Sequence, residues 1–500
     1  MKFFKILCVL AIALCLTASV YAETQSVKVS GDLTMRGIWR GSYTYQGAPT
    51  EPLARTGLDS ADKSWAMTAA EIEVDADLTD NVQTVIRLVN QRDWNVWDKN
   101  IDGTGSGVGN GSTTLIPNGL GGFTPNADEF DVEVDLAYVV LKDFIYSPLT
   151  LTIGRQDLWF GKGLIVGANQ QNPGAGVATR AGSLAAIGNL SAPEYTSINS
   201  FDSVKAVLDY DPWTITGIFA KIFEGAIQEK DDIDLWGLNV GYKFDAYKAE
   251  AEAYWFYKND HLVEPFRAIK DNSNDVHTVG LRGSLDPLDV LTLAAEGAYQ
   301  GGQYVGSRLQ LNNRSRSAWA IDASAEWRYW TDKLSWKPKL GAEYVYYSGN
   351  KAEDNPDAAA GDYTGWDPMY RGKFDSAIRE FVGRWYASSR YPARANYTIS
   401  TADASFTNQH QVIFLGSIQP IESLTLKANY NLFWNQEKYL ETNNKTKGFI
   451  GQEVDLQANW DYTEDVSFGV LAGWFFPGEV YFDNRNDIAT DLVGTVKVSF

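Results

Sequence analysis

The sequence predicts an all-β fold, a transmembrane antiparallel β-barrel of about 18 strands with short periplasmic turns and long extracellular loops. Three observations predict it. The last ten residues, 491–500, alternate apolar and polar side chains and end on an aromatic residue, which is typical of the closing strand of an outer-membrane barrel. Segments with the same two-residue period recur along the chain, about eighteen in all. The connections between them are alternately long and short.

The short connections are rich in Asp, Asn, Pro and charged pairs, which favour tight reversal of the chain over continued strand. We expect periplasmic turns at 79–81, 143–148, 209–212, 244–246, 286–287, 331–333, 419–422 and 463–465. We expect extracellular loops at about 46–62, 95–126, 157–200, 258–274, 302–316, 349–406, 437–448 and 477–487, with a shorter one near 225–230. An even strand number then puts both termini on the periplasmic side.

Single segments show which side chains face lipid. Between 319 and 329, Trp319, Ile321 and further apolar residues alternate with Asp322 and Glu326. The apolar set is expected against lipid and the polar set in a wet lumen. Tryptophans near the ends of such segments would form two interfacial girdles. A soluble β-sandwich would also bury aromatic residues, but it would not require the alternation of long and short connections.

The amino terminus has the features of an export signal. Lys2 and Lys5 precede an apolar run at 6–16 and a small-residue cleavage site at 20–22, so residues 1–22 are expected to be a signal peptide and 23–500 the barrel domain. The apolar run is too short to span a bilayer as a helix. Both cysteines lie inside the signal peptide. The predicted location is the outer membrane of a Gram-negative-type bacterium.

The charge balance is acidic. The chain has 43 basic and 63 acidic residues, a formal charge of −20, and removal of residues 1–22 makes the charge −22. Such a balance excludes nucleic acid as an expected partner. No Pro- or Ser-rich linker divides the chain, so we expect one domain after the signal peptide.

Motifs for chemistry are weak. The three histidines, His261, His277 and His410, have no Ser-His or metal-ligand spacing, although His410 could face the lumen. The glycine-rich segment 103–122 lacks the Lys-Ser/Thr of a phosphate-binding loop. The acidic loop 350–367 lacks the ligand spacing of a known calcium loop. We therefore predict no enzyme activity, no cofactor and no metal site.

Four segments carry a resemblance to a known family. Residues 451–481 begin with Gly-Gln-Glu-Val-Asp-Leu, continue through a short turn and a glycine-rich strand, and leave it through an aromatic-Pro-Gly-acidic sequence. Residues 153–156, Ile-Gly-Arg-Gln, precede the glycine-rich stretch 159–167. Weaker similarities lie at 406–411 and 430–434. With these segments the chain resembles the alginate export family of outer-membrane porins.

The resemblance implies a monomeric channel through which an anionic exopolysaccharide leaves the cell. It also implies a constriction lined by arginine and lysine, and loops or turns that act as plugs. Carried over to matching positions, it makes Arg155, Gln156, Glu453 and Asp455 lumen candidates. Simple alternation would point Arg155 at lipid, so its place in the lumen requires a break, such as a bulge, at Gly154.

Alternation along the other segments also projects charged side chains inward. The cations are Arg87, Lys205, Lys243, Arg282, Arg328, Lys337, Lys339, Lys427 and Lys497. The acids are more numerous: Glu71, Glu73, Asp75, Glu133, Asp135, Glu250, Glu252, Glu296, Asp322, Glu326, Glu343, Glu453 and Asp455. Many of these charges are expected to pair across the wall. An excess of acids weighs against a strongly polyanion-selective pore.

The predicted function is an outer-membrane channel for a hydrophilic, anionic solute such as an exopolysaccharide, by passive diffusion. One alternative is a general or nutrient-uptake porin, which a mixed or acidic constriction would favour. Another is a structural or adhesive surface barrel, favoured by a blocked lumen. The loops 157–200 and 349–406 are long enough to fold inward as a constriction or lid. Expected partners are outer-membrane lipid, the solute or polysaccharide, and periplasmic secretion components.

Overall fold

The computed structural model describes residues 26–42, 63–94, 132–169, 192–224, 232–261, 274–305, 313–350, 361–382, 406–440, 446–480 and 487–500. The predicted signal peptide at 1–22, the glycine-rich segment 103–122 and residues 351–360 of the acidic loop lie outside the described residues. No helix within the described ranges is long and apolar enough to cross a membrane.

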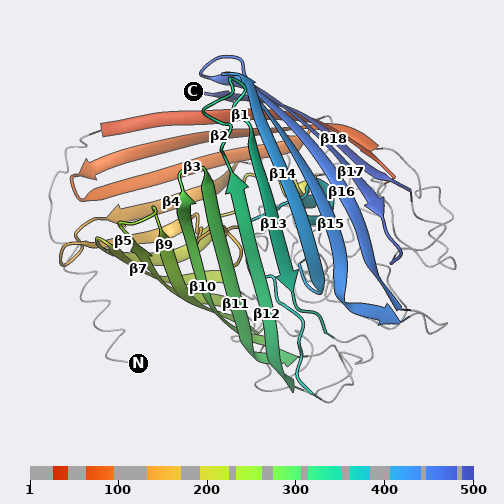
Figure 1. Ribbon diagram of the computed structural model, residues 1–500. Helices are drawn as coiled ribbons and strands as arrows, with labels where there is room; N and C mark the ends of the chain where they lie inside the picture. Colours follow the sequence, from red (N-terminus) through yellow and green to blue (C-terminus); the bar gives the residue numbers. More distant parts are fainter. Residues whose placement is uncertain are drawn as a thin grey trace, which may run out of the picture.

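The described residues contain eighteen antiparallel strands in one sheet, in chain order, and the sheet closes where β1 pairs with β18 (Figure 1). The predicted barrel and its strand number are therefore confirmed. The strands are β1(Ser26–Gly41), β2(Lys63–Thr79), β3(Val82–Asp93), β4(Glu133–Leu141), β5(Leu149–Gln156), β6(Phe201–Tyr210), β7(Trp213–Phe223), β8(Ile233–Lys243), β9(Glu250–Asp260), β10(Asn274–Leu288), β11(Leu291–Val305), β12(Asn313–Trp327), β13(Lys339–Tyr347), β14(Gln409–Ile421), β15(Leu424–Leu440), β16(Thr446–Asp461), β17(Val466–Pro477) and β18(Ala489–Ser499).

Most connections alternate in length as predicted, but the connection 328–338 between β12 and β13 is longer than the predicted turn 331–333, and the connection 441–445 between β15 and β16 is shorter than the predicted loop 437–448. The short turns expected at 286–287 and 419–422 overlap the ends of β10 and β14, where the pairing shifts register between Leu285 and Leu288 and between Ile418 and Ile421. Strands β11 and β12 extend into the loop predicted at 302–316. The glycines and asparagines at 302–316 predicted a loop there, but the strand pairing continues to Val305 and resumes at Asn313.

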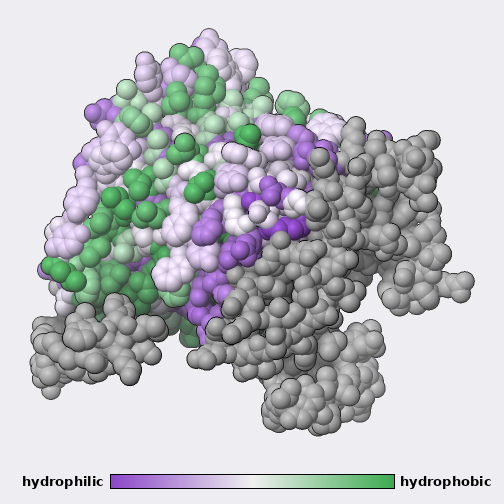
Figure 2. All heavy atoms as spheres, turned by 90° about the horizontal axis from the view of Figure 1, so that it is seen from below, coloured by the Kyte–Doolittle hydropathy of each residue, from purple (hydrophilic) through white to green (hydrophobic). Residues whose placement is uncertain are grey.

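The outer face of the wall is mostly apolar, whereas the inner face carries buried charged and polar side chains beside an apolar stretch on β6 to β14. In β12, Trp319 and Ile321 are 54% and 44% exposed, whereas Asp322, the residue after Ile321, is 1% exposed. Figure 2 shows hydrophobic residues along the wall beside a band of hydrophilic residues. Alternation thus places the two kinds of side chain on opposite faces, as a barrel in a membrane requires.

Three described loop segments fill the barrel. We call residues 157–169, 192–200 and 361–382 the plug; they include the short 3-10 helix η3(Pro193–Tyr195) and the π-helix η4(Ala377–Val382). The first and third segments pair through a parallel bridge between Val166 and Tyr370. The largest buried apolar cluster joins plug residues such as Ile165 and Trp366 to inward residues of β6 to β14 such as Phe256. The hydrophobic core of this protein therefore lies inside the barrel.

A plugged lumen as the candidate functional site

The plug touches the wall around the whole barrel. Polar contacts join Glu194 to Arg40 on β1, Thr196 to Gln91 on β3, Ser200 to Asp135 on β4, Asp367 to Lys258 on β9 and to Gln300 on β11, Lys373 to Asp322 on β12 and to Glu343 on β13, Arg379 to Gln409 on β14, and Ile378 to Glu453 on β16. Because neighbouring strands follow chain order, these contacts surround the lumen. The described parts of both long loops that were expected to decide the character of the pore, 157–169 with 192–200 and 361–382, therefore fold inward.

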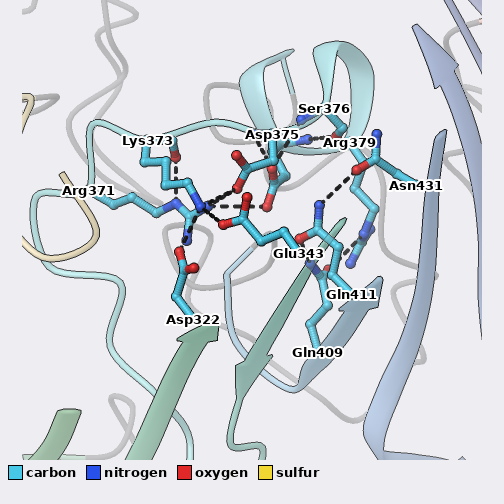
Figure 3. Close-up of polar contacts among 11 residues, drawn as sticks. Asp322, Glu343, Arg371, Lys373, Asp375, Ser376, Arg379, Gln409, Gln411 and Asn431 are labelled. Atoms are coloured by element: carbon cyan, nitrogen blue, oxygen red, sulfur yellow. Dashed lines mark hydrogen bonds and ion pairs between the residues drawn. The ribbon is translucent and has the colours of Figure 1, made fainter. Parts of the chain in front are cut away.

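Lys373 lies at the centre of a buried charge cluster (Figure 3). Its Nζ is 2.6 Å from Asp322 Oδ2 and 3.1 Å from Asp375 Oδ2, and it also pairs with Glu343. Burial alone would lower the pKa of Lys373, but the carboxylates of Asp375, Asp322 and Glu343 outweigh burial and raise it. The ammonium group of Lys373 thus stays charged, and the neighbouring carboxylates offset the cost of burying it.

Arg371 and Glu380 extend this cluster within the plug. Arg371 Nη2 lies 3.2 Å from Asp375 Oδ2 and 3.4 Å from Glu380 Oε1. Glu380 also accepts the backbone N–H of Asp375 at 2.6 Å and of Ser376 at 3.1 Å. Burial raises the pKa of Glu380 to about 7, although Arg371 opposes that shift. Glu380 therefore titrates close to neutral pH.

The beginning of η4 rests on two carboxylates of the wall. Ile378 and Arg379 donate their backbone N–H groups to the two oxygens of Glu453, at 2.6 and 2.9 Å, and Ala377 donates to Asp455 Oδ2 at 3.1 Å. The first N–H groups of a helix have no partner inside the helix, so a carboxylate satisfies both their bonding and their partial charge. Glu453 and Asp455 are 0% and 3% exposed. The Gly-Gln-Glu-Val-Asp-Leu segment thus holds the plug.

A series of neutral amides continues from η4 along β14 and β15. Arg379 Nε donates to Gln409 Oε1 at 2.9 Å, Gln409 donates to Gln411 at 3.3 Å, and Gln411 donates to Asn431 at 3.2 Å (Figure 3). His410, between the two glutamines, lies on the outer face, where its Nδ1 is 2.7 Å from Tyr344 Oη. The expectation that His410 could face the lumen was wrong, because alternation points Gln409 and Gln411 inward instead.

Arg155 also lies on the outer face. Gly154 has a φ of 127°, but the pairing of β5 with β4 and β6 runs through it without a shift, so the expected change of face is absent. Arg155 shares its face with Ile153, which is 40% exposed, and pairs with Asp202 at 3.1 Å. The irregularity lies instead on β4, opposite Arg87. Gln156 points the other way, is 2% exposed and donates to the carbonyls of Thr152 and Ser203.

Three predicted inward cations pair with carboxylates of the wall. Arg87 contacts Asp135 at 2.6 Å and lies within 4 Å of Glu71, Glu73 and Asp157. Arg282 pairs with Glu250 at 2.8 Å and with Glu252. Arg328 pairs with Asp286 at 3.3 Å and Glu326 at 3.4 Å. Pairing across neighbouring strands, expected for many of these charges, therefore holds for Arg87 and Arg282, whereas Arg328 lies just past the end of β12 and pairs with β10, two strands away, and with its own strand.

The remaining predicted cations lie mostly toward the periplasmic rim. Lys205 lies on β6 opposite Thr152, and Lys497 on β18 pairs with Asp32 at 3.2 Å. The others are exposed: Lys243 ends β8, Lys339 begins β13, Lys427 lies on β15, and Lys337 lies in the connection before β13. Lys337 was expected on a strand. It precedes Pro338, and the φ of Lys337, 43°, places this residue in a turn.

Sequence reasoning missed the charges that bind the plug to β1 and β18. Arg40 pairs with Asp491 at 3.1 Å and with Glu194 of η3, and all three side chains are at most 5% exposed. Two-residue alternation in β1 could have revealed Arg36 and Arg40 as inward cations. Lys162, Arg371 and Lys373 gave no such signal, because residues in irregular loops follow no period. In the described ranges, no group of three His, Cys, Asp or Glu side chains is arranged to hold a metal.

A closed barrel with an apolar outer face, a polar lumen and loops folded into that lumen defines an outer-membrane channel of the porin type. The model of the alginate export family matches residues 61–494, so the chain belongs to the alginate export family, and its place is the outer membrane. A search of curated proteins found no match.

Solved porin structures share the fold. OpdQ of Pseudomonas aeruginosa is 12% identical with a TM-score of 0.51, and the alignment covers 96% of this chain and 99% of that one. OccK8 (OprE) of the same organism is 8% identical with a TM-score of 0.51, covering 95% and 98%. OccAB1 of Acinetobacter baumannii is 11% identical with a TM-score of 0.50, covering 97% and 99%. At these identities the similarity concerns the fold.

Proposed function

We propose that this channel passes a hydrophilic, anionic solute, such as an exopolysaccharide, by passive diffusion when the plug moves aside. Membership of the alginate export family supports the solute class. The observation that carries the proposal is that carboxylates hold the charged side chains of Lys373 and Arg371. A solute rich in carboxylates offers these cations the same chemical partner as Asp322 and Asp375 do. Such a site binds and also releases, as conduction requires.

A nutrient-uptake porin of the same barrel type is the second candidate, and the charge balance beside the plug favours it. Four carboxylates, those of Asp322, Glu343, Asp375 and Glu380, surround Lys373 and Arg371. A mixed and acidic constriction of this kind would pass neutral or cationic solutes more readily than polyanions. The two candidates therefore differ in ion selectivity.

The experiment that separates them is a bilayer recording. Residues 23–500 are reconstituted in a planar bilayer, and the reversal potential is measured under a salt gradient, with and without added polyuronate or neutral dextran of equal length. The proposal expects anion-selective current that polyuronate blocks and dextran leaves open. Cation-selective current that polyuronate does not block would overturn it in favour of uptake. A complete lack of current, also in plug variants, would favour the third reading, a structural or adhesive barrel.

A further inference from the structure

One polar side chain from each of six adjacent strands forms a single row on the outside of the barrel. The register pairs Arg155 with Asp202, Asp202 with Lys221, Lys221 with Asp234, Asp234 with Asn259, and Asn259 with Asp275. Each residue lies within three positions of the end of its strand opposite the short turns. The row therefore follows the extracellular edge of β5 to β10.

The two outward rows below this one are apolar and aromatic. The first comprises Ile153, Val204, Phe219, Trp236, Tyr257 and His277, and the second Leu151, Ala206, Gly217, Leu238, Trp255 and Val279. Ring centroids are 4.4 Å apart for Phe219 and Trp236 and 4.3 Å apart for Tyr257 and His277. Aromatic rows of this kind mark the membrane interface, with aliphatic surface against the acyl chains. The polar row thus lies at the level of the lipid head groups.

The two cations of the row differ in their partners. Lys221 Nζ lies within 3.0 Å of three carboxylates, those of Asp232, Asp234 and Glu224, so its charge is already matched within the protein. The guanidinium of Arg155 has five N–H donors, and in the described part of the chain its partner is Asp202, which is itself largely exposed. Arg155 therefore keeps donors for a further ligand.

We propose that Arg155, steadied by Asp202, binds the phosphate of a phosphate-bearing lipid in the extracellular leaflet. Arginine matches phosphate geometry with two parallel hydrogen bonds, and it is more weakly hydrated than lysine. The adjoining aromatic and aliphatic rows would hold the acyl chains of the same lipid. The Gly-Arg-Gln segment then has two faces, with Gln156 pointing inward and Arg155 binding lipid.

The test titrates detergent-solubilised full-length protein with diphosphoryl lipid A, and with inorganic phosphate as the probe for a phosphate site without lipid. Bound lipid is counted by native mass spectrometry for wild type, Arg155→Ala, Arg155→Lys and Lys142→Ala. Lys142 is an exposed residue beside the periplasmic turn, so its loss removes the same charge from the opposite rim. Loss of a charge-assisted pair of hydrogen bonds predicts a roughly tenfold weaker affinity for Arg155→Ala.

The expected pattern is weaker lipid binding in Arg155→Ala, partial recovery in Arg155→Lys, and wild-type binding in Lys142→Ala, with unchanged channel conductance and selectivity in all of them. Wild-type lipid affinity in Arg155→Ala would overturn the proposal. Equal competition by inorganic phosphate would overturn its lipid component. A changed reversal potential in Arg155→Ala with unchanged lipid binding would place Arg155 in the conduction path and overturn it as well.

Discussion

Lys373 of the plug lies 2.6 Å from Asp322 of β12, and this contact joins the loop that crosses the lumen to the wall. Asp375 and Glu343 complete the site. Every partner of the ammonium is an ion rather than an apolar surface. The contact can therefore be replaced by water or by a charged solute, whereas the apolar part of the plug beside β6 to β14 has no such substitute.

Substitution of Lys373 should release the plug. Lys373→Met leaves Asp322, Glu343 and Asp375 without their cation, and breaking a buried pair in this way costs roughly 3–5 kcal/mol. We expect longer open times in single-channel recordings. Lys337→Met, which removes the same charge from an exposed turn, serves as the control. Identical open times in Lys373→Met and wild type would contradict this account of the cluster.

The carboxylates beneath η4 should hold it locally. Glu453→Gln removes the charge that accepts the N–H groups of Ile378 and Arg379, and a lost cap costs about 1 kcal/mol. We expect these two amides to exchange hydrogen faster, while amides in β16 itself stay protected. Asp461→Asn, at the exposed periplasmic end of the same strand, provides a charge change away from the cap. Unchanged exchange in Glu453→Gln would show that the carboxylate does not hold η4.

The plug should respond to pH through Glu380. Its pKa in the inserted plug, about 7, lies above its ordinary value of 4.5, so protonation favours insertion. This contribution is complete below pH 4.5 and is lost as the pH rises through about 7. We expect a lower open probability at pH 5 than at pH 8, with Arg371, Asp375 and Lys373 as the charges that face Glu380. Glu380→Gln should flatten this dependence between pH 5 and 8, and an unaltered dependence in that variant would assign it to another group.

Neighbouring residues on β14 should behave in opposite ways. Gln409→Leu removes the acceptor of Arg379 Nε from the buried side, so we expect it to alter channel closure. His410→Phe changes only the outer face near Tyr344 and should leave conductance and selectivity unchanged. Planar-bilayer recordings of both variants check the pair. An altered selectivity in His410→Phe would mean that this strand is turned the other way.

Alternation and turn composition were sufficient to predict the strands. The row of eighteen segments, the short turns and the lipid-facing side of β12 all follow from a two-residue period, which is a local property of the chain. Arg155 shows the limit of a family resemblance, because alternation alone gave the correct face and the added break at Gly154 did not. Lys337 shows the limit of projection, since a strand can end before the pattern does.

The plug could not be predicted, for a different physical reason. Lys373 and Arg371 lie in an irregular segment just before η4, which contains Glu380. The wall partners of Lys373, Asp322 and Glu343, lie on strands with the same mixed pattern as the rest of the lumen wall. The pairing depends on the path of the loop through the barrel, which no periodicity encodes. Glu453 and Asp455 were recognised as lumen residues by resemblance, but their role as acceptors for the backbone of η4 depends on where η4 lies in the folded protein.

The most direct test of the central claim asks whether current requires the plug to leave the wall. The sequence beyond residue 22 contains no cysteine, so Ala377→Cys with Asp455→Cys introduces a single thiol pair where the plug meets β16. A short, reducible bifunctional thiol reagent then joins plug and wall in the planar bilayer, with each single variant as the control. We expect the current of the double variant to fall on cross-linking and to return on reduction, and we expect the reagent to leave the current of each single variant unchanged. Full current through the cross-linked protein would contradict this account.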